Sequence, residues 1–154
     1  MTPRTRRRDE RGAVVPIVAV CLPIIIVATA FAVDLGLQRV LRRDLQALAD
    51  VVALDLAREL DGRPRAEYDA AELDAALAAS MARNDDVVGD DPDLDYELGT
   101  TGTSGFHAAA PDDVPTAVKV EASGHIGFAF AGTGGSAGRA AVASAEKSAC
   151  FNVG

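Results

Sequence analysis

The sequence predicts an α+β protein in which one long N-terminal helix crosses a membrane, continues as a stalk and leads into a small distal domain. Three observations predict this: an uncharged run near the start, a leucine stripe directly after it, and alternating apolar residues near the C-terminus. They divide the chain into a basic head (1–12), a transmembrane helix (13–33), an amphipathic stalk helix (34–61) and an extracytoplasmic domain (62–154). We expect that domain to hold a helical hairpin with the end of the stalk, and two or three antiparallel strands.

The uncharged run covers residues 13–33, AVVPIVAVCLPIIIVATAFAV. As a helix it is about 31 Å long, which matches a bilayer hydrocarbon core of about 30 Å. Pro16 lies in the first turn and Pro23 lies at a depth where membrane helices tolerate proline. We therefore expect a single transmembrane helix that stays in the mature protein.

The arginines favour one orientation of this helix. Five precede the span within residues 1–12, and three follow it at Arg39, Arg42 and Arg43. By the positive-inside rule the N-terminus lies in the cytoplasm and the distal domain lies outside the cytoplasmic (inner) membrane. The alternative is a secreted binding module whose apolar segment is an export signal cleaved near Ala28-Thr29-Ala30.

A stripe of apolar side chains, spaced three and four residues apart, predicts that the helix continues for about 45 residues in all, until Gly62 and Pro64 end it. The stripe consists of Leu37, Leu41, Leu45, Leu48, Val52, Leu56 and Leu60. One interpretation is that the distal domain folds back onto the stripe; the other is that stripes of neighbouring subunits pack together. The residues that we expect to carry this packing or interaction are Leu41, Leu45, Leu48 and Val52.

The same region resembles the TadE/TadG-like proteins of tight-adherence (Flp-type) pilus assembly. The residues that carry the resemblance are Val33-Asp34-Leu35-Gly36, Arg43-Asp44-Leu45-Gln46, Ala49-Asp50, Ala53-Leu54 and Ala57, directly after an apolar helix. The chain resembles the short TadG-like form, with no room for a von Willebrand A-type domain. The resemblance implies a structural membrane component of pilus assembly or of an associated secretion system. The partners that it implies are membrane lipid, other pilus-assembly or envelope proteins and further copies of the chain, with Asp34 and Gly36 shaping the exit from the bilayer.

Beyond the stalk, residues 66–84 have the pattern of a second amphipathic helix. Leu94, Tyr96 and Leu98 alternate as in a short strand, and residues 117–131 give the clearest strand signal. Ser123-Gly124 is either a break in that second signal or a bulge inside one long strand. Residues 132–138 suggest a turn, and the alanines of residues 139–150 fit a strand and a short helix equally well.

Charge excludes one class of partner. The formal net charge is −8, and residues 62–154 carry fifteen acidic side chains against six basic ones. Nucleic-acid binding needs a phosphate-neutralising surface, so we expect none. Asp91, Asp93 and Asp95 resemble the start of a calcium loop, but Tyr96 stands where that loop requires glycine. We expect a solvated acidic surface.

No residue pattern points to catalysis, a cofactor or a metal. His107 and His125 have no Cys, His or carboxylate at ligand spacing, and the thiol of Cys150 has only Lys147 nearby. A membrane-tethered enzyme would require a convergent cluster around His107, His125 or Cys150. We expect no catalytic, cofactor-binding or metal-binding residues.

Overall fold

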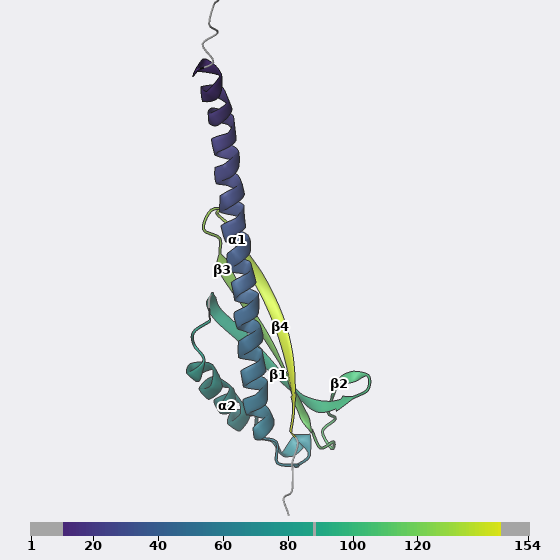
Figure 1. The fold of residues 1–154 in the computed structure, drawn as a ribbon. Coiled ribbons are helices and arrows are strands. Elements are labelled where there is room, and N and C mark those ends of the chain that lie inside the picture. The colour runs from purple at the N-terminus through teal and green to yellow at the C-terminus, as the bar shows by residue number, and fades with distance from the viewer. Residues whose placement is uncertain (1–10, 88, 146–154) are drawn as a thin grey trace, which may run out of the picture.

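The computed structural model describes residues 11–87 and 89–145. Its elements are α1 (Arg11–Arg58), the short 3-10 helix η1 (Arg65–Glu67), α2 (Ala70–Arg83), β1 (Asp90–Gly102), β2 (Gly105–Ala108), β3 (Ala117–Gly127) and β4 (Gly134–Ser144). The N-terminal part of α1 projects alone, and the C-terminal part packs against the sheet (Figure 1). The predicted α+β fold is confirmed.

Helix α1 runs for 48 residues without interruption, as the leucine stripe predicts. Its side chains from Val14 to Val33 are exposed apart from the half-buried Ala30, and Asp34 is the first buried residue. By length and composition this helix is able to cross a membrane. Burial therefore begins where the uncharged run ends.

A compact turn reverses the chain after α1. The Tyr68 hydroxyl accepts hydrogen bonds from the backbone N–H groups of Asp61 (2.9 Å) and Gly62 (3.3 Å) and donates one to Asp61 Oδ1 (3.0 Å). Gly62 has a φ of 95°, a left-handed conformation that favours glycine. Helix α2 starts at Ala70, later than the predicted residue 66, because the side chain of Asp69 caps it by accepting from the Ala71 N–H (2.9 Å). α2 then runs back beside α1, which forms the expected helical hairpin (Figure 1).

The sheet has four antiparallel strands in the order β2-β1-β3-β4, whereas the sequence predicted two or three. The additional strand is β2, which pairs with the end of β1 through a tight connection between Gly102 and Gly105. The Phe106 ring of β2 covers Gly99 so closely that a Cβ there would lie 2.5 Å from a ring atom. Glycine is depleted in strands, so Gly99 gave no indication that a strand pairs here. The sequence pattern therefore missed the β1–β2 hairpin.

Strand β3 is continuous through Ser123 and Gly124, so the predicted break at these residues is wrong. The irregularity lies in its partner, since the β1–β3 register shifts between Asp90 and Asp93. β3 ends at Gly127, short of the predicted residue 131, so Phe128 and Phe130 lie beyond it. β4 begins at Gly134, inside the segment predicted as a turn, and its alanines form a strand.

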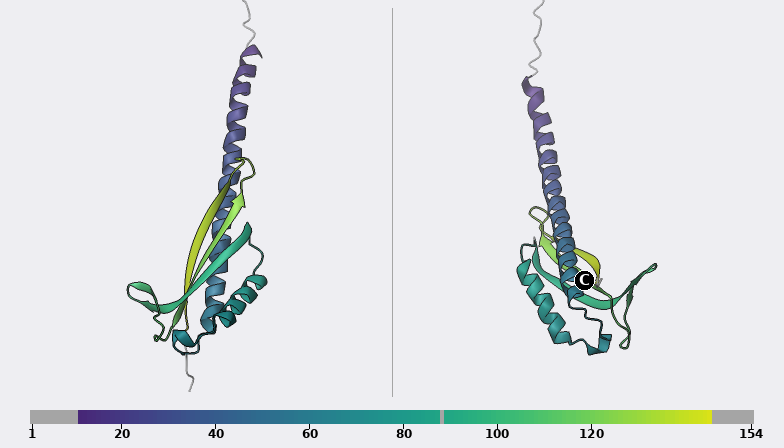
Figure 2. Two further views of the ribbon diagram at one scale, coloured as in Figure 1. Left: turned by 180° about the vertical axis from the view of Figure 1, so that it is seen from behind. Right: turned by 60° about the horizontal axis from the view of Figure 1, so that its bottom comes forward.

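One core joins the helices to the inner face of the sheet. It contains Leu41, Leu45, Leu48, Val52, Leu56 and Leu60 of α1, Leu73 of α2, Leu94 and Leu98 of β1, Val118, Val120, Ala122 and Ile126 of β3, and Ala141 and Ala143 of β4. The views in Figure 2 show the sheet wrapping around one side of α1, with α2 beside it. Small residues keep the layers close: a Cβ on Gly124 would lie 3.3 Å from Cδ2 of Leu45.

Candidate functional site

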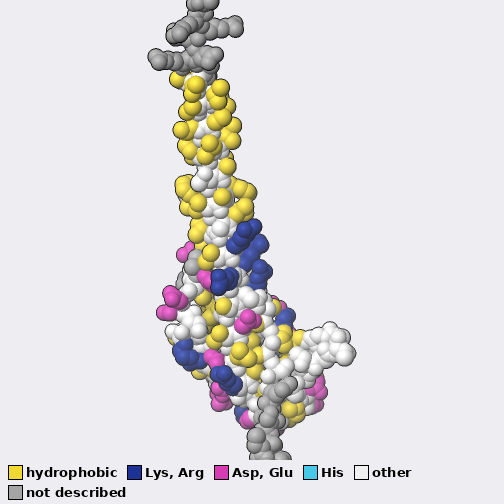
Figure 3. All heavy atoms as spheres, viewed as in Figure 1, with side chains coloured by type: hydrophobic (Ala, Val, Ile, Leu, Met, Phe, Trp, Pro, Cys, Tyr) yellow, Lys and Arg dark blue, Asp and Glu magenta, His cyan; other side chains and the backbone are white. Residues whose placement is uncertain are grey.

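The candidate site is the junction where the exposed part of α1 meets the distal domain. Figure 3 shows exposed apolar side chains along the projecting part of α1 above the junction, here called the apolar sleeve, with charged residues below it. Asp34 lies at this boundary with only 5% of its surface exposed. A carboxylate so little exposed must be hydrogen-bonded to offset the loss of its hydration.

Backbone N–H groups of the β3–β4 connection supply those hydrogen bonds. Asp34 Oδ1 accepts from the N–H of Ala129 (2.9 Å) and of Phe130 (3.3 Å), and Oδ2 accepts from the N–H of Ala131 (3.0 Å). Three converging N–H donors form a concave anion site of the kind that turns build. Bonds to a charged acceptor are stronger than neutral ones, so Asp34 ties the hairpin to α1 across about 95 residues of sequence.

The shape of the connection places these donors. The Phe128 N–H donates to the Thr133 carbonyl (2.8 Å), which closes the turn, and Gly132 takes a left-handed φ of 66°. The side chain of Phe128 packs against the core, whereas Phe130 is 64% exposed. The hairpin tip therefore reaches along α1 to the level where the apolar sleeve begins (Figure 1).

Gly36, the second residue predicted to shape the membrane exit, makes no close contact. A Cβ at this position would meet no atom within 4 Å, and Gly36 has ordinary helical geometry within α1. Within the described chain the packing does not require a glycine here.

Leu41, Leu45, Leu48 and Val52 are all buried in the core of the same chain. In the structure they hold the distal domain to α1, which is the first of the two arrangements that the sequence left open. Beyond Leu35, the large apolar residues that α1 leaves exposed lie on another side of the helix: Val40, Val51 and Leu54.

A second polar junction joins α1 to α2. Asp55 accepts hydrogen bonds from Ser80 Oγ (2.7 Å), Arg83 Nη2 (2.8 Å) and Arg58 Nη1 (3.1 Å). The side chain of Asp55 is 20% exposed, and the bond from Ser80 and then the one from Arg83 lower the pKa of its carboxyl. Burial and, after it, the neighbouring Asp74, which accepts from the Tyr96 hydroxyl (3.0 Å), raise the pKa of Tyr96 to about 12. The bonds to Asp55 hold α2 against α1, and the Tyr96–Asp74 bond holds α2 against β1.

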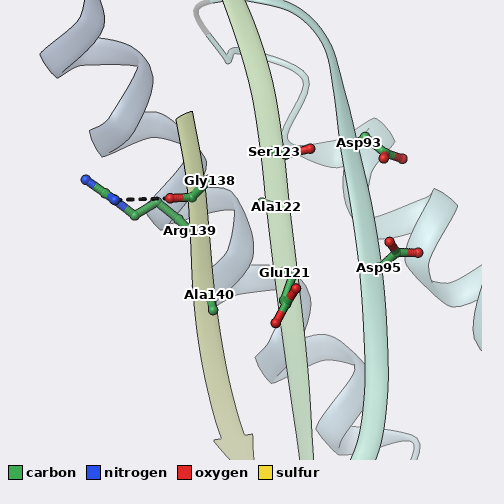
Figure 4. Close-up of a pocket in the computed structure, with 8 residues that line it drawn as sticks. All are labelled: Asp93, Asp95, Glu121, Ala122, Ser123, Gly138, Arg139 and Ala140. Carbon is green, nitrogen blue, oxygen red and sulfur yellow. Dashed lines mark hydrogen bonds between the residues drawn. The ribbon is translucent and has the colours of Figure 1, made fainter. Parts of the chain in front are cut away.

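Acidic side chains occupy the face of the sheet that points away from α1. Asp93 and Asp95 of β1 lie beside Glu121 of β3 along a shallow hollow of about 320 Å³ (Figure 4). Glu121 also forms an ion pair with Lys119. Arg139 of β4 points away from these carboxylates, and its Nη1 donates to the Gly138 carbonyl (3.0 Å). The described residues contain no group of three or more His, Cys, Asp or Glu side chains placed to bind a metal ion.

The two histidines lie far apart. His107 pairs with Thr100 in the β1–β2 hairpin, and His125 pairs with Asp90 at the opposite end of β1, about 33 Å along the strand. His107 Nε2 lies 2.6 Å from Ser104 Oγ on an exposed turn. Cys150 lies outside the described residues. His107 and His125 therefore cannot serve one catalytic centre.

Sequence patterns identified Asp34 but not its partners. The Phe-Ala-Phe-Ala-Gly run at residues 128–132 shows no polar side chain, because its contribution consists of backbone N–H groups. The Gly-rich stretch after a strand was the available signal, since such stretches often expose backbone donors. Asp55 and Arg58 lie three residues apart on one helix, but Ser80 and Arg83 lie too far along the chain for helix periodicity to reveal them.

The structure thus defines an α+β protein with one long apolar helix that is able to cross a membrane and whose other half forms part of the distal core. Residues 12–58 match the family model described as putative Flp pilus-assembly TadE/G-like. The match covers the segment whose residues carry the resemblance, and it confirms that this segment is TadE/G-like. No curated protein and no solved structure matches the chain.

Proposed function

We propose that this protein is a single-pass component of Flp/Tad-type pilus assembly, or of an associated secretion system, that acts structurally. The observation that carries the proposal is the continuity of α1, which is an exposed apolar helix at one end and the centre of the distal core at the other. One rigid element thus sets the height of the distal domain above the bilayer. Leu41, Leu45, Leu48 and Val52 hold the domain to that element, and Asp34 fixes the hairpin tip at the membrane exit.

The proposed orientation follows from the arginines, with residues 1–12 in the cytoplasm and the distal domain outside the inner membrane. In that position the acidic sheet face and the exposed side of α1 are available to envelope proteins. Because the leucine stripe is buried, self-association or partner binding would use Val40, Val51 and Leu54 instead. Leu54 is 52% exposed, which is the largest exposed fraction of the three.

Cysteine crosslinking in native membranes tests this proposal. Leu54→Cys, on α1, and Val142→Cys, on the exposed side of β4, are introduced separately in a Cys21→Ala, Cys150→Ala background. We expect Leu54→Cys to give crosslinked products larger than the monomer that contain a second copy or a pilus-assembly protein, and Val142→Cys to give fewer. Monomer alone at both positions would contradict an assembly role. A chain secreted without residues 1–30 would support the alternative, a secreted binding module.

A further inference from the structure

We propose that the membrane-proximal end of the distal domain binds the phosphate groups of anionic lipids through four arginines, Arg39, Arg42, Arg43 and Arg139. The proposal rests on the proposed membrane anchoring and adds a lipid class that the anchor recognises. The four residues line an open hollow of about 570 Å³ between α1 and β4, together with Gln46, Ala47 and Asp50. Figure 3 shows dark blue side chains gathered on α1 directly below the apolar sleeve.

The tertiary fold creates this cluster within an acidic protein. Arg39, Arg42 and Arg43 lie on one side of α1, because residues three and four apart share a helix face. Arg139 comes from β4, almost one hundred residues later, and points toward α1 rather than toward the acidic sheet face (Figure 4). The fold thus brings four positive charges together, three from α1 and one from β4.

No protein partner within the described residues neutralises the three helix arginines: none of them makes a hydrogen bond or an ion pair there. The carboxylate that lines the hollow, Asp50, accepts from Gln46 Nε2 (2.9 Å), and Gln46 also reaches the Ala140 carbonyl (3.4 Å). The guanidinium groups remain available to an external anion. Their forked donors match the geometry of phosphate.

The short distance between the arginines and the apolar span favours lipid as the source of that phosphate. If the hydrocarbon ends at Asp34, then Arg39 lies about 8 Å and Arg43 about 14 Å below it along the helix. The head-group layer extends about 5–8 Å beyond the hydrocarbon. Side chains of a helix lean toward its N-terminus, which here means toward the bilayer, and long arginine side chains extend further in that direction. The cluster can therefore reach the phosphate layer.

The test uses the full-length chain in nanodiscs that contain equal amounts of phosphatidylglycerol and phosphatidylcholine. Native mass spectrometry of the released protein counts the lipids of each kind that it retains. We expect the wild-type protein to retain phosphatidylglycerol preferentially. Each surface arginine near an anionic membrane contributes about fivefold, so the Arg39→Gln, Arg42→Gln, Arg43→Gln variant should lose at least about tenfold of that preference.

Three further variants separate the effects of charge and position from an effect on folding. The triple Arg→Lys variant keeps the charge and should keep most of the preference. Arg42→Gln should lower the preference about fivefold, whereas Arg58→Gln, on the same helix but far from the span, should leave it unchanged. Equal retention of both lipids by the wild-type protein, as expected if the arginines instead bind an acidic protein, would overturn the proposal. So would a triple Gln variant with wild-type preference.

Extraction with alkaline carbonate distinguishes the two proposals. A chain that stays in the membrane pellet but shows no lipid preference refutes only the lipid site. A chain that carbonate releases refutes the membrane anchoring on which the site depends.

Discussion

Asp34 is the residue on which the junction depends, because its two carboxylate oxygens receive three backbone hydrogen bonds from one turn. Replacing Asp34 with Ala leaves those N–H groups without an acceptor in a half-buried place. Losing charged hydrogen bonds of this kind costs about 3 kcal/mol. We expect hydrogen exchange of the Ala129–Ala131 amides to accelerate by about two orders of magnitude, measured by mass spectrometry on the full-length chain.

Two variants control this prediction. Asp50→Ala removes an exposed carboxylate that accepts a hydrogen bond from Gln46, four residues away on the same helix, so it should change stability by no more than about 0.5 kcal/mol. Asp34→Asn keeps one acceptor oxygen and should fall between the wild-type protein and Asp34→Ala. Unchanged exchange at residues 129–131 in Asp34→Ala would show that the hairpin tip is held by other contacts.

The interactions of Asp55 predict that the stability of the folded protein depends on pH. Its carboxyl pKa is lowered in the folded protein by the bonds from Ser80 and Arg83, so the folded state binds a proton less readily than the unfolded state. The stabilisation is therefore complete above the ordinary aspartate pKa of about 3.9 and is lost as the pH falls through the lower, folded value. We expect Asp55→Asn to be less stable than the wild-type protein at pH 7.

The measurement is the free energy of unfolding in detergent from pH 7 to pH 3. The difference between the wild-type protein and Asp55→Asn should shrink below about pH 4, because protonation then removes the same interactions in the wild-type protein. A difference that stays constant over this range would mean that the charge of Asp55 does not stabilise the α1–α2 junction.

At the scale of the element, α1 has two apolar sides with different roles. Leu45 is fully buried, so Leu45→Ala should destabilise the distal domain by about 2–5 kcal/mol. Leu54→Ala removes a similar side chain from an exposed position and should change stability by no more than about 0.5 kcal/mol. Thermal unfolding of both variants checks this. Equal effects would contradict the division of α1 into a core side and an outer side.

Gly36 gives a complementary prediction. Gly36→Ala adds a Cβ where no atom lies within 4 Å, and alanine favours a helix over glycine by about 0.5–1 kcal/mol. The purified variant should therefore unfold at the same or a slightly higher temperature. A lower unfolding temperature would show that Gly36 makes a close contact in the folded protein.

Elements whose signal is local were predictable from the sequence, and elements defined by tertiary contacts were not. Helical periodicity is a property of neighbouring residues, so the uninterrupted helix through Leu41–Leu60 was foreseeable. The alanines of β4 fit a strand and a helix equally well, and the sheet determines the outcome by pairing Ala141 with Val120 of β3. Similarly, Arg139 joins the helix arginines only because β4 lies beside α1. Such long-range juxtapositions have no sequence period to reveal them.

At the scale of the whole molecule, the two halves of α1 are suited to different surroundings. Its N-terminal half presents apolar side chains on every side, as lipid requires, and its C-terminal half presents them to a protein core. Burial starts at Asp34, so a cut near Ala30 would remove the exposed half and leave the distal core complete. The fate of residues 13–33 in the cell therefore determines whether the domain is anchored or secreted.

Intact mass of the protein extracted from washed native membranes measures that fate. We expect the mass of the whole chain, 15.9 kDa, with or without Met1. A native form that begins near Thr29 to Val33, or a full-length chain that is soluble without detergent, would contradict the proposal that α1 anchors the distal domain in a membrane.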